Sequence, residues 1–354
     1  MRAAVLAEYG EPLDLTTVPA PDPPPDGAVL SVEACGLCRS DWHAWQGHGE
    51  WNDDQVPCGQ ILGHEPAGKV LAVGENVERI AEGDRVVAPF SLGDGTCHNC
   101  RSGHGNVCTD GFALGFEPDA PGAFAEQVAV PAADYNLADL PDWMEPRDAA
   151  VLGCRYMTTY HALVDRAGVE AGNWLAVHGC GGVGLSAVQL GTALGARVIA
   201  VDPKAGARDQ AATLGAVETI DPEVADPVDE IRSITDGGAA VSVDALGIAE
   251  TCRNSVRCLR ERGTHAQVGL TTDAERGEVA LPTDWITRWE ITVVGSRGMP
   301  PTRYGALFDL LDARNADPGT LIARECTLGE VSERLAAMSE YRIDGVELLT
   351  AFDR

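Results

Sequence analysis

The sequence predicts two domains, a β-rich domain and an α/β domain built on a doubly wound parallel sheet. Three observations lead to this prediction. The chain has 354 residues, about twice the length of a typical domain of roughly 150 residues. Its first third contains short strand patterns separated by Gly, Pro and Asp. From about residue 153, apolar runs alternate with helical stretches, which is typical of repeated βαβ units.

The first third is expected to form an antiparallel β domain without repeats, because its strand patterns are β-branched or alternating and end at turn-forming residues. The expected strands lie at residues 3–6, 28–34, 69–73, 84–88 and 124–130.

The following part is expected to form a parallel sheet with right-handed crossovers and helices on both faces. Strands are expected at residues 174–178, 197–201, 217–220, 241–244, 265–269 and 291–295, and helices at 185–194, 205–214 and 249–259. Two amphipathic helices, 304–313 and 328–338, and a strand at 346–349 complete the chain. The pattern alone does not assign this tail to either domain.

The charge composition excludes nonspecific attraction to nucleic acid or to an anionic membrane. Acidic residues outnumber basic ones 54 to 26, which gives a formal net charge of −28. Lys69 and Lys204 are the two lysines among the basic residues. This acidic, lysine-poor composition predicts a protein adapted to high salt, in which hydrated carboxylates maintain solubility.

The cysteines favour metal binding in a reducing compartment. The sequence has 11 cysteines, and several are clustered with short gaps, unlike the dense framework of a short secreted scaffold. The first residues, 1–7, contain no basic stretch followed by an apolar run, and no window of the sequence approaches the roughly 20 apolar residues that span a bilayer. We therefore expect a cytoplasmic protein without a membrane segment.

A glycine-rich turn between an expected strand and an expected helix predicts a dinucleotide site. The turn, residues 179–184, reads Gly-Cys-Gly-Gly-Val-Gly. Gly179 permits the tight turn, Gly181 lets the backbone approach a pyrophosphate, and Gly184 lets the helix pack on the sheet. Gly182 and Val183 lie at the helix N-terminus, whose free N–H groups bind phosphate. A purely structural turn is the alternative.

Asp202 ends the next strand, eighteen residues after Gly184. A carboxylate there accepts hydrogen bonds from an adenosine ribose and repels a 2′-phosphate, so NAD is favoured over NADP. NADP remains an alternative, because Lys204 and Arg208 follow closely and could compensate.

Scattered Cys and His residues form a candidate catalytic zinc site. Residues 35–43 read CGLCRSDWH, residues 63–65 read GHE, and Cys154 follows a glycine. Two thiolates and one imidazole, from Cys38, His64 and Cys154, would leave an open fourth position, as a catalytic zinc requires. Ser40 and His43 are three residues apart, on one face of any helix that Ser40 begins, which suits a proton relay. From spacing alone, buried core thiols are the stronger interpretation.

These strings, in this order before the glycine-rich turn, resemble the zinc-dependent alcohol dehydrogenases of the medium-chain dehydrogenase/reductase superfamily. The resemblance covers nearly the whole chain, down to residues 341–345. It implies a GroES-like β-rich catalytic domain at residues 1–152, completed by 296–354, and a Rossmann NAD-binding domain at 153–295. It also implies an active site in the cleft between the two domains.

The resemblance implies a role for each motif residue. Cys38, His64 and Cys154 match the ligands of the catalytic zinc, and Ser40 and His43 match the proton relay that includes the cofactor ribose. The remaining matches are Asp41, which orients the ligand histidine, Glu65, an acid beside the zinc, and the cofactor-binding positions Arg39 and Val268. Cys35 and Cys180 match no functional position, and we expect them to be packed thiols.

A second cluster has the spacing of a structural zinc site. Asp94, Cys97, Cys100 and Cys108 stand where related enzymes carry four cysteines. Because an aspartate oxygen can also bind Zn²⁺, we expect an Asp-Cys₃ site. His98 or His104 in place of Asp94, or a lobe without metal, are the alternatives.

The resemblance implies hydride transfer between a primary or secondary alcohol and NAD, giving an aldehyde or ketone, by a homo-oligomer (a dimer or tetramer). A polyol or sugar dehydrogenase of the same superfamily is one alternative, and a non-catalytic protein that binds zinc and NAD is another. Several aromatic residues are candidates to line the substrate pocket, with core packing as the alternative role: Trp42, Trp45, Trp51, Phe90 and Trp285.

Overall fold

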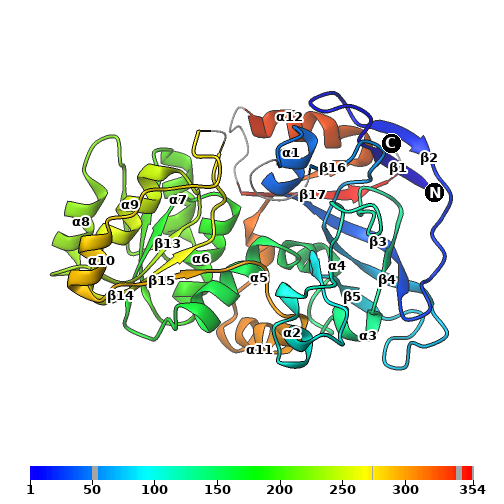
Figure 1. The fold of residues 1–354 in the computed structure, drawn as a ribbon, viewed down its shortest axis with the longest axis horizontal. Coiled ribbons are helices and arrows are strands. Elements are labelled where there is room, and N and C mark those ends of the chain that lie inside the picture. Colours follow the sequence, from blue (N-terminus) through cyan, green and yellow to red (C-terminus); the bar gives the residue numbers. More distant parts are fainter. Residues whose placement is uncertain (50–54, 273, 340–344, 353–354) are drawn as a thin grey trace. The chain divides into compact units, whose positions relative to one another are not determined.

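The computed structural model describes residues 1–49, 55–272, 274–339 and 345–352. It divides into two compact units, coloured by sequence in Figure 1. The first unit comprises Met1–Met157, Gly298–Asp309 and Asp317–Arg354, and the second comprises Thr158–Arg297 and Leu310–Ala316. The units divide after Met157 and before Gly298, and residues 310–316 join the second unit.

The first unit is built on a seven-stranded sheet. In spatial order its strands are β16 (Ile322–Thr327), β17 (Val346–Ala351), β3 (Ala28–Leu37), β4 (Glu65–Val73), β5 (Arg85–Val87) and β9 (Ala138–Asp139), with β8 (Gln127–Val130) paired to β3. β16 and β17 pair in parallel, and the other pairs are antiparallel. Two small sheets pair β1 (Arg2–Val5) with β2 (Asp14–Thr17) and β6 (Ser91–Leu92) with β7 (Phe112–Ala113).

Strand β3 is the centre of this sheet and places the first candidate ligands. Its sequence AVLSVEACGL is buried at every position except Ser31 and Glu33, as expected for a strand with neighbours on both edges. The register sets Gly36 opposite Glu65 and Leu37 opposite Glu347. The end of β3, which leads into Cys38, therefore lies beside the start of β4, which follows His64.

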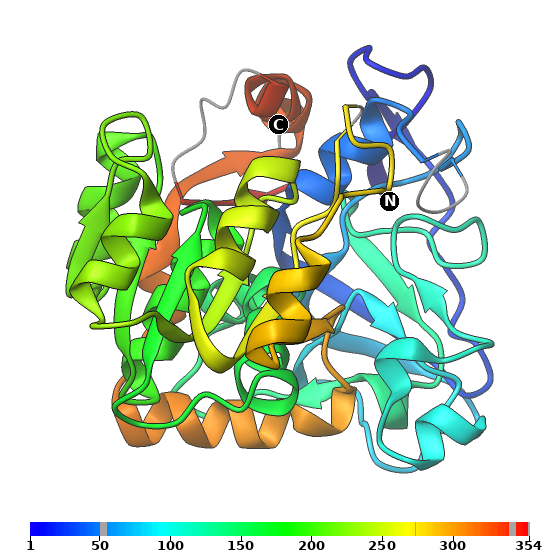
Figure 2. The ribbon, with the colours of Figure 1, turned by 60° about the vertical axis from the view of Figure 1, so that its left-hand side comes forward.

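The helices of the first unit are short. Helix α1 (Arg39–Trp45) follows β3 directly and lies beside α12 (Val331–Ser339), as Figures 1 and 2 both show. The other helices are α2 (His98–Arg101), α3 (Ala133–Asn136) and α4 (Pro146–Ala149), and α5 (Arg155–Tyr160) and α11 (Tyr304–Arg314) each cross a limit between the units. Single 3₁₀ turns occupy Gly105–Val107, Ala150–Leu152, Pro301–Arg303, Pro318–Leu321 and Leu328–Glu330.

The second unit is a six-stranded sheet in which every pair is parallel, as predicted. In spatial order its strands are β12 (Glu218–Ile220), β11 (Arg197–Val201), β10 (Trp174–His178), β13 (Ala239–Asp244), β14 (Leu259–Gln267) and β15 (Thr292–Gly295). Its helices are α6 (Gly182–Ala193), α7 (Ala205–Thr213), α8 (Pro227–Ile234), α9 (Ala249–Arg257) and α10 (Thr283–Trp289), and His161–Arg166 forms a π-helix.

The strand order reverses direction between β10 and β13, which is the signature of a doubly wound sheet. Helices α6 and α7 contact each other, as do α8 and α9. With right-handed crossovers, these two pairs cover opposite faces of the sheet. The carboxyl ends of β10, β11, β13 and β14 therefore meet at one edge, where ligands of such sheets bind.

Several elements were not predicted from the sequence. Helix α8 is one of them, although the sequence carries a helix-start signal there. Asp226 accepts hydrogen bonds from the backbone N–H groups of Val228 and Asp229, and Pro227 stands at the first helical position. Strand β14 was predicted to begin at 265 but begins at Leu259, with an irregularity that includes Arg262 at a φ of 59°. Polar residues in this bulged half hid its strand character.

No helix in the described part of the chain is both long enough and apolar enough to cross a membrane.

A buried ion pair attaches α12 to the sheet of the first unit. The guanidinium of Arg334 donates to both carboxylate oxygens of Glu347 on β17, each at 2.7 Å, and the two residues are 9% and 3% exposed. A buried pair of this kind strongly destabilises a fold when one partner is removed, because the other charge stays buried and uncompensated.

We predict that Arg334→Met lowers the free energy of unfolding by about 3–5 kcal/mol, because Glu347 is left without its cation. Urea denaturation followed by tryptophan fluorescence measures the change.

The matched control is Arg324→Met. Arg324 pairs with Glu330 at 3.3 Å, but these side chains are 44% and 39% exposed, so the cost is expected to stay below about 1 kcal/mol. Equal effects of the two substitutions would contradict the argument from burial.

Candidate active site

Four ligand-type side chains converge in the first unit. Sulfur, nitrogen or oxygen atoms of Cys38, His64, Glu65 and Cys154 all lie within 4.8 Å of one another. The first three residues are buried and Cys154 is half-buried. Cys38 is the N-cap of α1, His64 and Glu65 stand at the start of β4, and Cys154 directly precedes α5. The structure thus brings together three residues that the sequence analysis selected from distant segments, together with Glu65.

The Asp41 carboxylate organises this cluster. Its Oδ1 accepts hydrogen bonds from Nδ1 of His64 at 2.8 Å and from the backbone N–H of Gly63 at 3.0 Å. Its Oδ2 accepts from the backbone N–H of Cys38 at 2.9 Å. In the neutral imidazole, a proton on Nδ1 that the carboxylate accepts leaves the lone pair on Nε2, as in metal-binding histidines.

The cluster fits a tetrahedral zinc ion. Nε2 of His64 is buried and has no hydrogen-bond partner, which is costly unless another group binds it. The Sγ atoms of Cys38 and Cys154 are 4.0 Å apart. Two sulfurs bound to one zinc at about 2.3 Å in a tetrahedron are about 3.8 Å apart. The orphaned nitrogen and the sulfur spacing therefore both suit this ion.

The acid–base properties of the ligand groups depend on their contacts. Contact with Cys154 and the charge of Arg155 hold the pKa of Cys38 well below its usual range, against the effect of burial. The contact with Cys38, together with burial, raises the pKa of Cys154. Burial alone would lower the pKa of His64, but the Asp41 carboxylate and Cys38 outweigh it and raise that pKa. The cluster therefore favours a thiolate at Cys38.

Arg155 is a site residue that the sequence analysis missed. Its Nη2 donates to Oε1 and Oε2 of Glu65 at 3.0 and 3.1 Å and to the Leu37 carbonyl at 2.7 Å, and its Nε donates to Oε1 at 3.3 Å. Burial raises the pKa of Glu65 to about 8, although the guanidinium opposes this shift. The sequence signal that could have identified Arg155 is a charged residue in a largely apolar segment, directly after the candidate ligand Cys154.

The two predicted relay residues lie on α1. Oγ of Ser40 is 3.8 Å from Sγ of Cys38, so the hydroxyl borders the cluster. Nδ1 of His43 is 3.0 Å from Nδ1 of His48, and the ring edge of Trp42 contacts both imidazoles. The sequence did not indicate the pairing with His48.

Arg39, which was expected to bind the cofactor, has contacts within the first unit. Its guanidinium stacks 4.1 Å from the centre of the Trp42 ring, and Nη1 donates to the Met338 carbonyl at 3.0 Å. The indole N–H of Trp42 donates to Ser339 at 2.7 Å. These contacts link α1 to the end of α12.

The aromatic candidates differ in their positions. Phe90 and Phe116 lie beside the His64 ring, with ring centres 5.9 and 4.8 Å away, and Phe116 was not foreseen. Trp45 is only 4% exposed and belongs to the hydrophobic core. It therefore packs in the core, which was the alternative to lining the substrate pocket. Trp285 lies in the second unit against Trp289. Trp51 lies outside the described residues.

The second cluster assembles with Asp94 as a member. Ligand-type atoms of Asp94, Cys97, Cys100 and Cys108 lie within 4.8 Å of one another, and this group includes neither His98 nor His104. The Sγ atoms of Cys97 and Cys108 are 3.5 Å apart, and Sγ of Cys108 is 3.3 Å from Oδ1 of Asp94.

The local chain holds the Asp94 carboxylate ionised. Its Oδ1 accepts from the backbone N–H groups of Thr96 and Cys97 at 2.9 and 3.0 Å, and its Oδ2 accepts from the Thr96 hydroxyl at 2.6 Å. These hydrogen bonds lower the pKa of Asp94 far below its usual range. An anionic oxygen thus faces three sulfurs, a donor set that zinc accepts.

The glycine-rich turn of the second unit has the geometry of a phosphate loop. Gly179 has a φ of +90°, a conformation that favours glycine. A Cβ on Gly184 would lie 1.7 Å from the Gly179 carbonyl oxygen, so no side chain fits there. A Cβ on Gly181, in contrast, would meet no atom within 4 Å. The loop therefore leaves open space above Gly181 at the start of α6. Gly182 and Val183 begin that helix.

Asp202 stands directly after β11 and anchors the same loop. Its Oδ2 accepts from the backbone N–H of Cys180 at 2.8 Å, and its Oδ1 accepts from that of Lys204 at 2.9 Å. Arg208 forms an ion pair with Asp221 at 2.9 Å and donates to the Asp202 and Pro203 carbonyls at 2.7 Å. Because its donors are engaged, Arg208 is a poor candidate to compensate a 2′-phosphate.

Asp244, at the end of β13, is a second anchor that the sequence analysis missed. Its Oδ1 accepts from the backbone N–H groups of Leu246 and Gly247 and from the Thr251 hydroxyl, all at 3.0–3.1 Å. Its backbone carbonyl accepts from the N–H of Val268 at 3.1 Å. Asp244 therefore fixes two loops at the sheet edge, the loop after β13 through its buried carboxylate and the loop that carries Val268 through its backbone carbonyl. The sequence signal that could have identified Asp244 is its position at the end of a predicted strand, which it shares with Asp202.

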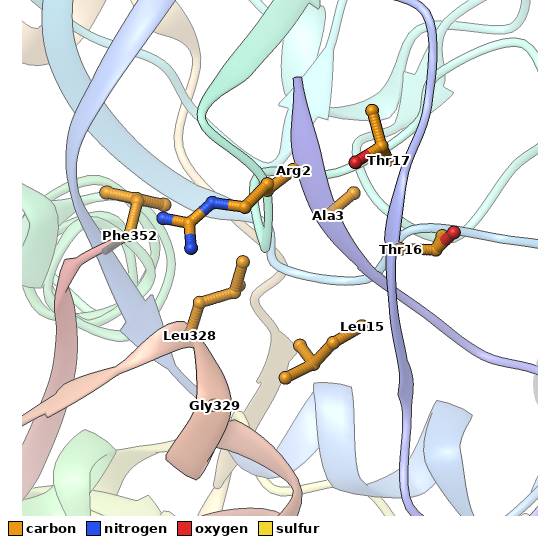
Figure 3. Close-up of a pocket in the computed structure, with 8 residues that line it drawn as sticks. All are labelled: Arg2, Ala3, Leu15, Thr16, Thr17, Leu328, Gly329 and Phe352. Carbon is orange, nitrogen blue, oxygen red and sulfur yellow. The ribbon is translucent and has the colours of Figure 1, made fainter. Parts of the chain in front are cut away.

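A pocket of about 460 Å³ lies apart from these groups, among β1, β2 and the C-terminal segment. Figure 3 shows the Arg2 guanidinium in it between Phe352 and Leu328. No candidate ligand or relay residue lines this pocket, so it is distinct from the site described above.

Two family models match the chain. The alcohol dehydrogenase GroES-like domain matches residues 24–142, and the zinc-binding dehydrogenase model matches residues 182–313. An NAD-dependent alcohol dehydrogenase of Sulfurisphaera tokodaii is 33% identical, with 99% of each chain covered. A sorbitol dehydrogenase of Halalkalibacterium halodurans is 30% identical, with 93% of this chain and 94% of the relative covered. The solved alcohol dehydrogenase TADH of Thermus sp. ATN1 superposes with a TM-score of 0.91 at 29% identity, covering 99% of this chain and 100% of the other.

The phosphate loop yields a pair of contrasting substitutions. Gly184→Ala forces a methyl group against the Gly179 carbonyl, and we predict a loss of about 1–3 kcal/mol in unfolding free energy. Gly181→Ala places its methyl group in open space. It is predicted to leave stability unchanged but to weaken dinucleotide binding at least about tenfold, or 1.4 kcal/mol.

Thermal unfolding and fluorescence titration with the reduced dinucleotide measure the two effects. Unchanged binding by the Gly181→Ala variant would show that the open space does not receive the pyrophosphate.

Proposed function

Since the chain belongs to the zinc-binding alcohol dehydrogenases, we propose that it transfers a hydride between a primary or secondary alcohol and NAD, giving an aldehyde or ketone. The observation that carries this proposal is the buried cluster in which the unpartnered Nε2 of His64 faces the thiols of Cys38 and Cys154. Three protein ligands around an open position are typical of catalytic zinc, whereas structural sites have four.

In this proposal Cys38, His64 and Cys154 hold the catalytic zinc. Two thiolates and a neutral imidazole offset the charge of the ion. When bound, zinc supplies a Lewis acid that stabilises negative charge on the substrate oxygen, and NAD supplies the hydride acceptor. Asp41 fixes the tautomer and orientation of His64 through the 2.8 Å hydrogen bond.

Proton transfer is assigned to α1. The Ser40 hydroxyl, beside Cys38, accepts the alcohol proton as it releases its own. The His43 imidazole, three residues further along the helix, accepts the released proton and passes it toward solvent. The 3.0 Å contact with Nδ1 of His48 orients the His43 ring.

For the cofactor, the proposal assigns the pyrophosphate to the loop of Gly179, Gly181, Gly182, Val183 and Gly184. Space above Gly181 and the start of α6 support this assignment. The Asp202 carboxylate is assigned to the adenosine ribose, which favours NAD over NADP. The further cofactor contacts proposed are Arg39, Lys204 and Val268.

We assign a structural zinc to Asp94, Cys97, Cys100 and Cys108. Four convergent ligand-type atoms and an ionised carboxylate support this assignment. A closed tetrahedral site of this kind cross-links a lobe that has little secondary structure of its own, namely the four-residue helix α2 and one 3₁₀ turn.

The likeness to a sorbitol dehydrogenase makes a polyol the second candidate substrate. Two features of this chain favour a less polar alcohol. Phe90 and Phe116 lie beside the His64 ring, and Cys154 stands where many polyol dehydrogenases have a carboxylate. A pocket next to aromatic rings binds an apolar chain better than a row of hydroxyl groups.

Three broader assignments belong to the same proposal. A net charge of −28 with two lysines supports adaptation to high salt. All 11 cysteines are free thiols in the structure, which supports the cytoplasm, a reducing compartment. The exposed strand β15, at one edge of its sheet, offers a surface for a homo-oligomer (a dimer or tetramer).

We predict that Cys38→Ala lowers zinc content from two ions per chain to one and lowers kcat by on the order of 10³-fold or more, because several kcal/mol of charge stabilisation are lost. Metal analysis and NADH absorbance in high salt measure both, with ethanol, longer alcohols, benzyl alcohol and sorbitol as substrates.

Cys97→Ala is the control, because Cys97 belongs to the second cluster. This variant is expected to lose one zinc and some stability but to keep its activity. No NAD reduction by the zinc-loaded parent protein with any of these alcohols would favour a non-catalytic protein.

We predict that Asp202→Ser lowers the ratio of kcat/KM for NAD to that for NADP at least about tenfold, because the charge that repels a 2′-phosphate is removed. Steady-state kinetics with both cofactors measures the ratio. Asp209→Ser, an exposed substitution on α7 with the same change of charge, is the control. An unchanged ratio in the Asp202 variant would refute the ribose assignment.

A further inference from the structure

Glu65 presents a difficulty for the proposed catalytic site, because its carboxylate is a fourth zinc-binding group within the cluster. Its Oε1 is 3.8 Å from Nε2 of His64, and its ligand-type oxygen shares the 4.8 Å group with Cys38 and Cys154. If the carboxylate bound the ion, the tetrahedral site would be closed and no substrate could enter. Something in the fold must keep this oxygen away from the ion.

The neighbouring guanidinium holds both oxygens of Glu65. Nη2 of Arg155 donates to Oε1 and to Oε2, and Nε donates to Oε1, at 3.0–3.3 Å. The same Nη2 donates to the Leu37 carbonyl at 2.7 Å, which fixes the guanidinium to the end of β3. Arg155 is 5% exposed and Glu65 is 0% exposed, so water cannot replace either partner.

The backbone around Glu65 is shaped for this position. A Cβ on Gly36 would lie 2.1 Å from Oε2 of Glu65, and a Cβ on Gly153 would lie 2.8 Å from its Cα. Glycines at both places let the carboxylate lie against the β3 backbone, on the side where Arg155 donates to it.

We propose that Arg155 keeps the Glu65 carboxylate off the zinc and so holds the fourth coordination position open for the substrate. Moving Glu65 to the metal would break the three hydrogen bonds that its carboxylate accepts from the buried guanidinium, which is strongly unfavourable. When the guanidinium is absent, these hydrogen bonds no longer restrain the carboxylate, whose Oε1 lies 3.8 Å from the metal-facing Nε2 of His64. Arg155 is thus a positioning residue that acts through Glu65. This inference rests on the proposed function.

The test replaces zinc by Co²⁺, whose visible spectrum reports coordination, and uses imidazole as a probe of the open position. In the parent protein, imidazole is expected to shift the cobalt bands. In Arg155→Met, Glu65 is expected to occupy the fourth position, so the dissociation constant for imidazole rises at least tenfold. Zinc X-ray absorption is expected to gain a carboxylate oxygen, and kcat/KM for the alcohol falls.

The double variant Arg155→Met/Glu65→Gln removes the competing carboxylate and is expected to restore imidazole binding to within threefold of the parent. Arg334→Met, which breaks a comparable buried pair with Glu347, is the control for lost stability and should leave the cobalt spectrum unchanged. If Arg155→Met fails to fold, Arg155→Lys provides the test, with a rise of at least threefold in the imidazole dissociation constant.

The outcomes separate this inference from the proposed function. If the parent protein binds no cobalt through Cys38, the proposed function fails. If the parent binds cobalt and imidazole, and Arg155→Met or its folded Arg155→Lys substitute does the same with equal affinity, the role of Arg155 is overturned. Failure of the double variant to regain imidazole binding would equally overturn it, because the closure would then not depend on Glu65.

Discussion

The contact between Asp41 and His64 is the interaction on which the candidate active site depends. One buried carboxylate receives the His64 Nδ1 hydrogen bond together with the backbone N–H groups of Cys38 and Gly63. It therefore fixes the end of β3, the start of β4 and the direction of the imidazole at once. Without it, Nε2 of His64 would have no defined direction, and the approach of the two sulfurs would not define a site. Charge-assisted hydrogen bonds of this kind are strong because they are buried.

The second unit uses the same device at the edge of its parallel sheet. Asp202 directly follows β11 and Asp244 ends β13, the two strands that flank β10. The Asp202 carboxylate accepts backbone N–H groups from the loops after β10 and β11, and the Asp244 carboxylate accepts them from the loop after β13. Loops at such an edge have few backbone partners of their own, and a carboxylate supplies them. These hydrogen bonds fix the loops relative to the strand ends, and a dinucleotide site requires loops held in one conformation. These two carboxylates, one buried at Asp244 and one half-buried at Asp202, are thus distinguished from the other acidic residues of this sheet edge by their fixed backbone donors.

Local pattern predicted much of the fold and many residues of the candidate site. Strands 174–178 and 197–201 were predicted with their observed limits, because parallel strands buried on both faces are continuous apolar runs. The polar half of β14 and the pairing of β16 with β17 escaped, since both depend on tertiary partners. Phe116 and His48 escaped for the same reason. An isolated Phe or His has no spacing that marks it, and only the folded chain places it beside a residue of the site.

The buried and exposed charges of this chain respond to salt differently, and this bears on how an acidic protein maintains a metal site. Salt screens exposed charges separated by more than about 8–10 Å, but it screens buried contacts far less. The pair of Arg155 with Glu65 and that of Asp41 with His64 involve residues that are at most 5% exposed. Their balance is therefore set inside the fold and is largely independent of ionic strength. Changes in salt concentration therefore act mainly on the exposed carboxylates and leave the arrangement of the buried pairs unchanged.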